Sequence, residues 1–523
     1  MRMKKLLLLF AGLLLGWCGH AQVSQTVRWE RELKNSSNHY TLIPMGSQGI
    51  ALVHDKQKYE AGKHFWEIIA LDTLLQETWT QEISVDNRYN FIGHDFRDGF
   101  VYFLFRYGET DSGDLKVLKM GDGKDGVETH SYDPQLSIKL THFNVIESKA
   151  ILAGYLSSEP AILLFDLEND QGRIVPGLFV KSTQLLDVRV NTNNTFNIVL
   201  SESPSKANKK LVIKTFDHTG TLLLDDAIGV EGNKTILSAV TSTLSRDELL
   251  IAGTWTEGVN QQAAGFYSVT VDPYNEQKIN YYDFPQLSHF LEYLSPKRKA
   301  KTKSKADRKR AQGKVPDFRV AASPVRIEET TDGFLFFLEA HSSTTEPSQY
   351  NRYNGYPFSG MPYPYGFYPG AGYPYRLYNS PYYYNPAFNN SGAVEVKMLQ
   401  ASVVVLDAKG AWLADHGCKL DEIKTPTADQ ISDFLYHNKK VAILAAKEKE
   451  LVWQISQSDG VPLVNEKKTI RLQLATEAIR SDDDAATVRH WFGSQMIVYG
   501  YQTIKNPEKG NRDVFFINKV TVE

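Results

Sequence analysis

The stretch RDGFVYFLF, Arg97 to Phe105, joins a tight turn to a run of six apolar residues. A short apolar run that follows a turn and is rich in aromatic and β-branched residues predicts a strand buried on both faces. The pattern returns in apolar runs that begin at Ile50, Phe100, Ala150, Thr195, Leu249, Phe334, Val441 and Met496. Successive starts lie 50, 50, 45, 54, 85, 107 and 55 residues apart, which indicates a repeat near 50 residues with two long insertions.

Each repeat reads as four strands, a to d, in an antiparallel meander. A weaker strand precedes the apolar run, as in NRYNFIG (Asn87–Gly93), and a hairpin such as WEIIALDTLLQETW (Trp66–Trp79) follows it. Asp suits the hairpin because its carboxylate caps the turn, and Gly suits it because it accepts a positive φ. Four-stranded units repeated around a circle predict an all-β fold, a single β-propeller over residues 22–523. Eight blades are counted, and seven is the alternative.

The last repeat, Thr487 to Glu523, contains strands a, b and c but lacks strand d. The segment TVRWEREL, Thr26 to Leu33, is a spare strand at the other end of the chain. We expect it to complete the last blade, because this closes the ring and covers an exposed sheet edge.

The hairpins between strands c and d resemble those of quinoprotein-like propellers, which often read apolar-Asp-x-x-x-Gly-x-apolar-Trp. LDTLLQETW (Leu71–Trp79) has Gln76 at the Gly position, and VLDAKGAWL (Val405–Leu413) has its Gly one place early. This resemblance implies the fold class and no quinone, and no cofactor is predicted.

The first 21 residues read as an export signal, with Arg2, Lys4 and Lys5 before an apolar run and small residues at Gly19 and Ala21. Export predicts a periplasmic, secreted or surface-associated protein, and no later stretch is long and apolar enough for a transmembrane helix. Only Cys418 remains after cleavage, so the fold must rest on a large core rather than on disulfides. The mature chain carries a net charge of −6.

The first insertion, residues 285–316 between the fifth and sixth blades, is strongly basic. Ser295 to Lys314 hold ten Lys or Arg and one Asp. Such a block is typical of a solvated loop, and it is also a candidate anion-binding arm. A short helix is expected in LSHFLEYLSP, ending at Pro296. The candidate binding residues are Lys297, Arg298, Lys299, Lys301, Lys303, Lys305, Arg308, Lys309 and Arg310.

The second insertion, residues 343–392 in the sixth blade, is rich in Tyr, Pro and Gly. Twelve of the residues from Tyr350 to Phe388 are Tyr. These rings either pack on the propeller, bind a partner or belong to a spacer. Partner binding suits Tyr because it gives a large contact area at low entropy cost. The candidate binding residues are Tyr356, Tyr363, Tyr365, Tyr368, Tyr373, Tyr375, Tyr382, Tyr383 and Tyr384.

The meander places both insertions on one face, beside each other, because the d-to-a and b-to-c connections leave the sheet at the same end. The first hypothesis is therefore an exported, non-catalytic binding or scaffold protein of the cell envelope. Its partner would be an envelope protein or glycan, with an anionic polymer as a further candidate, and nucleic acid is not expected as the natural target.

No catalytic motif stands out, and no catalytic or metal-ligating residue is assigned. Asp482, Asp483 and Asp484 could hold Ca²⁺ but lack the alternating spacing of a calcium loop, and His490 reads as a packed or rim residue. Two alternatives stay open. One is a carbohydrate-active hydrolase or lyase with its site at the channel mouth. The other is a polyanion-binding module.

Overall fold

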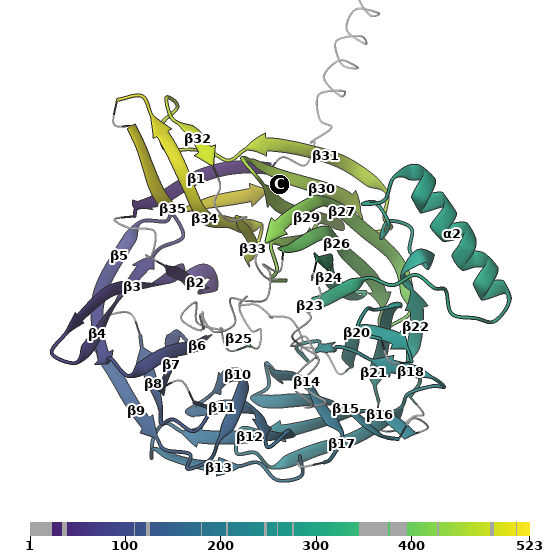
Figure 1. Ribbon diagram of the computed structural model, residues 1–523, viewed down its shortest axis with the longest axis horizontal. Helices are drawn as coiled ribbons and strands as arrows, with labels where there is room; N and C mark the ends of the chain where they lie inside the picture. Colours follow the sequence, from purple (N-terminus) through teal and green to yellow (C-terminus); the bar gives the residue numbers. More distant parts are fainter. Residues whose placement is uncertain are drawn as a thin grey trace, which may run out of the picture.

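The computed structural model describes residues 23–33, 39–108, 110–121, 126–178, 180–205, 208–244, 248–258, 260–272, 274, 277–344, 375–376, 395–425, 428–481, 486–508 and 510–523. All structural statements concern these residues, and the predicted export signal lies outside them. Eight sheets are arranged in a ring (Figure 1), which confirms the eight-bladed propeller and removes the seven-bladed alternative.

In the first four blades the chain runs from the innermost strand outward. Blade 1 contains β2 (Tyr40–Pro44), β3 (Ile50–Glu60), β4 (Lys63–Leu71) and β5 (Glu77–Asp86). Blade 2 contains β6 (Tyr89–Arg97), β7 (Phe100–Tyr107), β8 (Leu115–Met120) and β9 (Val127–Tyr132). Blade 3 contains β10 (Ile138–Ile146), β11 (Lys149–Leu156), β12 (Glu159–Asp166) and β13 (Gln171–Ile174). Blade 4 contains β14 (Thr183–Val190), β15 (Thr195–Ser205), β16 (Asn208–Asp217) and β17 (Leu222–Gly229).

The inner strands of blades 5 and 8 are each divided into two pieces. Blade 5 contains β18 (Lys234–Ile236), β19 (Val240–Thr241), β20 (Leu249–Glu257), β21 (Gly265–Val271) and β22 (Asn280–Asp283). Blade 6 contains β23 (Ala321–Glu329), β24 (Gly333–Thr344), β26 (Glu395–Asp407) and β27 (Trp412–Thr425). Blade 7 contains β28 (Ser432–His437), β29 (Lys440–Lys447), β30 (Glu450–Gln457) and β31 (Pro462–Thr469). Blade 8 contains β32 (Ala478–Ser481), β33 (Thr487–Phe492), β34 (Gln495–Asn506), β35 (Gly510–Val522) and β1 (Val23–Glu32).

The apolar runs are the second strands of the blades, and β7 shows why they carry no polar alternation. Phe103 and Phe105 pack in the core shared with blade 1, whereas Tyr102 and Leu104 pack in the core shared with blade 3. Successive side chains point to opposite faces of a strand, so a strand between two neighbouring blades must be apolar on both.

The c-to-d hairpins have the predicted chemistry. The carboxylate of Asp217 accepts the backbone N–H groups of Thr219 and Thr221, both at 2.8 Å, and Gly220 has φ +75°. The Asp407 carboxylate accepts two backbone N–H groups in the same way, and Gly410 has φ +77°. Each Asp therefore fixes its own turn.

The ring is closed by β1, which pairs antiparallel with β35 from Val23↔Val522 to Glu32↔Val514. The predicted closing strand is confirmed, and it begins three residues earlier than expected.

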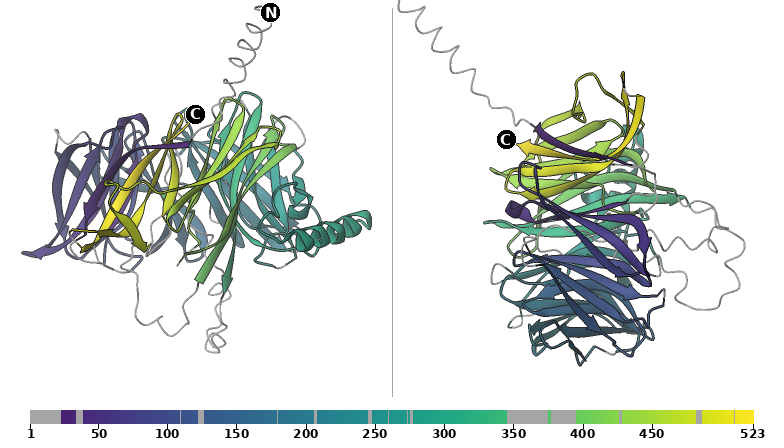
Figure 2. Two further views of the ribbon diagram at one scale, coloured as in Figure 1. Left: turned by 90° about the horizontal axis from the view of Figure 1, so that it is seen from above. Right: turned by 90° about the vertical axis from the view of Figure 1, so that its left-hand side faces the viewer.

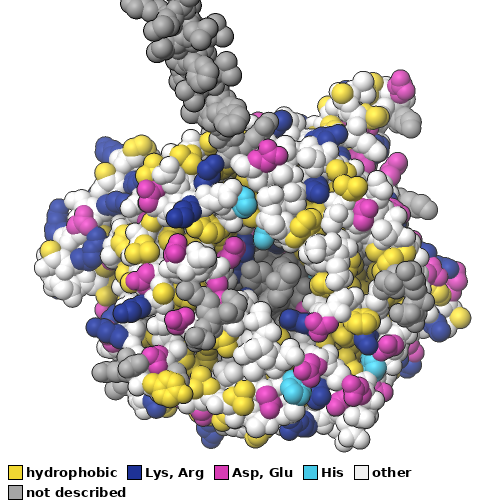
Figure 3. Space-filling view, turned by 180° about the vertical axis from the view of Figure 1, so that it is seen from behind, with side chains coloured by type: hydrophobic (Ala, Val, Ile, Leu, Met, Phe, Trp, Pro, Cys, Tyr) yellow, Lys and Arg dark blue, Asp and Glu magenta, His cyan; other side chains and the backbone are white. Residues whose placement is uncertain are grey.

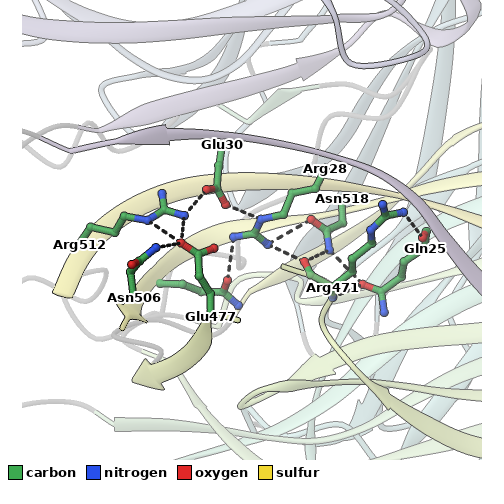
Figure 4. A network of polar contacts seen from close by, with 9 residues as sticks. Gln25, Arg28, Glu30, Arg471, Glu477, Asn506, Arg512 and Asn518 are labelled. Carbon is green, nitrogen blue, oxygen red and sulfur yellow. Dashed lines mark hydrogen bonds and ion pairs between the residues drawn. The ribbon is translucent and has the colours of Figure 1, made fainter. Parts of the chain in front are cut away.

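A network of buried charges holds this closing strand (Figure 4). Arg28 of β1 donates to Glu30 at 2.6 Å, and Glu30 also pairs with Arg512 of β35. Arg512 in turn lies 2.9 Å from Glu477, which precedes β32. The side chains of Arg28 and Glu30 are 2% and 4% exposed, so the first and last strands share ions that water does not reach.

Candidate functional site

The basic insertion starts with an apolar foot that fixes it to the propeller. It begins with η3 (Phe284–Gln286), and Phe284, Leu287, Phe290 and Leu291 are fully buried in the core between blades 5 and 6. The rings of Phe284 and Phe290 stack with centroids 4.0 Å apart. The prediction of a helix in LSHFLEYLSP is wrong. These residues form turns whose apolar side chains are buried in the core.

Two polar side chains of blade 6 hold the foot. The Asp415 carboxylate accepts the backbone N–H groups of Ser288 at 2.8 Å and His289 at 2.6 Å, and burial raises its pKa. Gln400 Oε1 accepts the N–H of Glu292 at 2.9 Å. Gly417 allows this approach, because a Cβ there would lie 2.3 Å from the carbonyl oxygen of His289.

The basic segment itself is the helix α2 (Pro296–Ala311), which lies outside the ring beside blades 5 and 6 (Figures 1 and 2). The interpretation as an unstructured loop is therefore wrong. Pro296 occupies the first turn, where a missing N–H costs nothing, and Ala, Lys and Arg are good helix formers.

The cations of α2 divide into an inward and an outward row. On the inward side, Lys299 pairs with Glu292 at 2.6 Å, Lys303 donates to the Ser288 carbonyl at 3.2 Å, and Arg310 pairs with Asp283 at 2.6 Å. Ala306 lies on this side with 2% exposure. Burial, with the neighbouring Lys299, lowers the pKa of Lys303. Three of the nine candidate cations thus attach the helix to the propeller.

The outward row contains Lys297, Lys301, Lys305 and Arg308, all exposed, and Arg298 lies beside it. Lys305 and the adjacent Lys309 contact the exposed Asp317 at 3.0 and 3.3 Å. Within the described residues, Lys297, Arg298, Lys301 and Arg308 make no ion pair. At about 100° per residue the two rows lie on opposite sides of the helix.

The Tyr-rich insertion lies outside the described residues, apart from residues 343–344 at the end of β24 and β25 (Tyr375–Arg376). Of the nine candidate tyrosines, only Tyr375 is described. β25 pairs with β10, the innermost strand of blade 3, through His142↔Arg376 and Phe143↔Tyr375. The described parts of the two insertions are therefore apart, one at the inner edge of blade 3 and the other outside the ring. The expected adjacency of two arms does not hold for them.

The wall around the axis contains charged side chains whose role the sequence did not predict. In three blades a buried Asp of the inner strand accepts a backbone N–H from the inner strand of the next blade. These contacts are Asp95 with Val145 at 2.7 Å, Asp187 with Thr241 at 3.0 Å and Asp433 with His490 at 2.8 Å. We name these three carboxylates the blade latches. The sequence offers one sign of these contacts, a lone Asp within an inner strand, as in HDFR, LDVR and SDFL.

Buried residues of blade 6 extend the latches toward blade 7. Arg326 Nη2 lies 2.9 Å from Asp433 Oδ1, and Glu339 accepts the backbone N–H of Ser432 at 2.9 Å. Burial raises the pKa of Asp95 and of Glu339 to about 7 each. Burial also lowers the pKa of His341 to about 4. The raised pKa values thus belong to Asp95 and Glu339, which join blades, whereas His341 lies 3.2 Å from Ser323 of its own blade.

The other groups noted in the sequence have ordinary surroundings or are not described. His490 Nε2 lies 3.0 Å from the Gly493 carbonyl oxygen, in agreement with a packed residue. Asp482, Asp483 and Asp484 lie outside the described residues. Within the described ranges, no three His, Cys, Asp or Glu side chains are grouped as metal ligands would be, and no helix has the length and apolar composition of a membrane span.

The face with the c-to-d hairpins differs from α2 in its charge pattern. Figure 3 shows acidic, basic and apolar side chains interspersed around a central hollow. The outward side of α2 instead carries the row of cations Lys297, Lys301, Lys305 and Arg308.

No protein-family model and no curated protein matches the sequence. Several solved structures are similar in fold. The polysaccharide lyase Uly1 is 9% identical with a TM-score of 0.38, over 94% of this chain and 100% of that chain. The β-propeller domain of the Trilobed protease from Pyrococcus furiosus is 9% identical with a TM-score of 0.34, over 82% and 93%. Prolyl oligopeptidase B from Galerina marginata is 9% identical with a TM-score of 0.37, over 92% and 55%. At these identities the likeness concerns the fold alone.

Proposed function

We propose that this protein is an exported, non-catalytic propeller that acts as a binding or scaffold protein at the cell envelope. It contacts its partner through the outward side of α2 and through the Tyr-rich insertion. The observation that carries the proposal is the difference between the two sides of α2. Its inward cations and the apolar foot fix the helix, while Lys297, Lys301 and Arg308 face outward without an ion partner in the described residues.

The fixed foot is relevant because an arm that is already ordered loses little conformational entropy when it binds. The buried ionisable groups of the wall support the non-catalytic part of the proposal. Asp95, Asp433 and Glu339 each accept backbone N–H groups of a neighbouring blade, which is a task in assembly.

The test compares two variants with the wild-type protein. In one, residues 296–312 are replaced by a Gly-Ser linker, and in the other, residues 346–392 are deleted. We expect both to keep a melting temperature close to that of the wild type, since neither change removes a residue of the cores between blades. The first removes the ion pairs of Lys299 and Arg310, and the second removes β25 from the edge of blade 3. We expect both to lose partner capture in pull-downs from envelope extract. Undiminished capture by both variants would contradict the proposed contact surface. Turnover of a polysaccharide by the wild-type protein would contradict the non-catalytic role.

A further inference from the structure

The length and spacing of the outward row of α2 favour a chain of anionic groups over a single small anion. Lys297, Lys301, Lys305 and Arg308 follow one another at intervals of four, four and three residues on one side of the helix. With a rise of 1.5 Å per residue the row is about 16 Å long, with a cation about every 5 Å. A single small anion reaches one or two of these cations, whereas a chain of anions reaches all four.

The row is electrostatically unfavourable in the free protein. Like charges four residues apart repel, as at Lys297/Lys301 and Lys301/Lys305. The first turn contains no acidic residue, so Lys297 and Arg298 also face the positive end of the helix dipole. Lys305 has Asp317 as a partner, but both side chains are more than half exposed, and such pairs contribute little. A bound polyanion would relieve this repulsion.

The composition of α2 argues against a lipid surface as the partner. A helix that lies on a membrane inserts large apolar side chains. The sequence PKRKAKTKSKADRKRA contains no Leu, Ile, Val, Met, Phe, Tyr or Trp.

The same helix fits nucleic acid poorly. Proteins that bind single strands stack bases on aromatic rings, and α2 has none. An exported protein, as proposed above, also does not meet nucleic acid as its natural target.

We infer that the outward row of α2 binds a linear acidic polysaccharide, whose carboxylate or sulfate groups pair in sequence with Lys297, Lys301, Lys305 and Arg308. This inference rests on the proposed function and specifies the chemistry of the partner. Affinity comes from several weak contacts on one polymer, so it depends on chain length and on salt.

The test uses alginate oligosaccharides as the probe and calorimetry as the readout. The outward variant is Lys297→Gln/Lys301→Gln/Lys305→Gln/Arg308→Gln. Its matched control is Lys181→Gln/Lys210→Gln/Lys439→Gln/Lys468→Gln, which removes four exposed lysines that lie outside α2. We expect at least a tenfold loss of affinity in the outward variant, less than twofold in the control, and an affinity that falls as salt rises. Circular dichroism checks that both variants are folded.

Three further probes decide the class of partner: neutral dextran, a single-stranded oligodeoxynucleotide and phosphatidylglycerol vesicles. Tighter α2-dependent binding of the oligonucleotide or the vesicles than of alginate would overturn the inference. Equal losses in the outward and control variants would overturn it as well. If alginate does not bind while the linker variant still loses envelope capture, this inference fails and the proposed function stands. If neither effect is seen, both fail.

Discussion

The closing strand offers a direct comparison of a buried and an exposed charge. Arg28 and Arg31 both lie on β1 and both pair with carboxylates, but their side chains are 2% and 30% exposed. We predict that Arg28→Met loosens the closure strongly and that Arg31→Met loosens it little.

The magnitude follows from burial. Removing one partner of a buried ion pair costs about 3–5 kcal/mol, because the remaining charge stays out of water. Glu30 keeps Arg512 as a partner in Arg28→Met, so the lower limit of about 3 kcal/mol applies. Arg31 pairs with Glu67 at 2.7 Å and Glu77 at 3.1 Å near the surface, where a pair contributes about 0–1 kcal/mol.

The assay is hydrogen exchange of the β1 and β35 amides, measured by mass spectrometry under conditions where exchange reports the opening equilibrium. A loss of about 3 kcal/mol accelerates exchange by about 150-fold, since 1.4 kcal/mol is tenfold. Arg31→Met should accelerate it less than about fivefold. Equal acceleration in the two variants would refute the reasoning, because it would mean that burial of the network does not decide its contribution.

Two further predictions concern the wall and the foot of α2. Because burial raises the pKa of Asp95 and Glu339 to about 7, protonation favours the folded state, and the free energy of unfolding should fall as pH rises from about 4 through 7. Asp95→Asn/Glu339→Gln should flatten this part of a denaturant-midpoint profile, and an unchanged slope would show that these groups do not cause it. Gly417→Ala should displace the foot, since the added Cβ meets the His289 carbonyl oxygen. We expect it to lower the free energy of unfolding by about 2 kcal/mol or more and to speed proteolysis next to α2. Gly229→Ala, with open space around the new Cβ, is its control, and equal proteolysis of the two would contradict the role of Gly417.

The ring and its closure could be predicted from the sequence because they depend on local patterns. Phe100 and Thr195 begin their strands where the apolar runs begin, and Asp217 and Asp407 cap their hairpins as expected. The site was only partly predictable. Composition identifies the cations of α2, but which of them face outward depends on contacts of Lys299 and Arg310 with residues of the foot and of β22.

The blade latches show a second limit of sequence reasoning. Asp95 and Val145 are 50 residues apart, so the predicted repeat places their strands in neighbouring blades, but it does not indicate that the carboxylate accepts the Val145 N–H. A carboxylate inside an apolar strand can serve catalysis or packing equally well. Only the donors that its oxygen atoms contact distinguish the two roles.

The pairing of β1 with β35 also has a consequence for the order of assembly. The ribosome makes β1 before the other described strands of the ring, and its partner β35 follows almost 500 residues later, as Val23↔Val522 shows. Blade 8 therefore cannot be complete until β35 has been made, and β1 lacks its partner strand until then. A long-lived, unpaired strand edge is prone to wrong pairing. We expect a newly made chain to depend on a holding chaperone until its last strand is available.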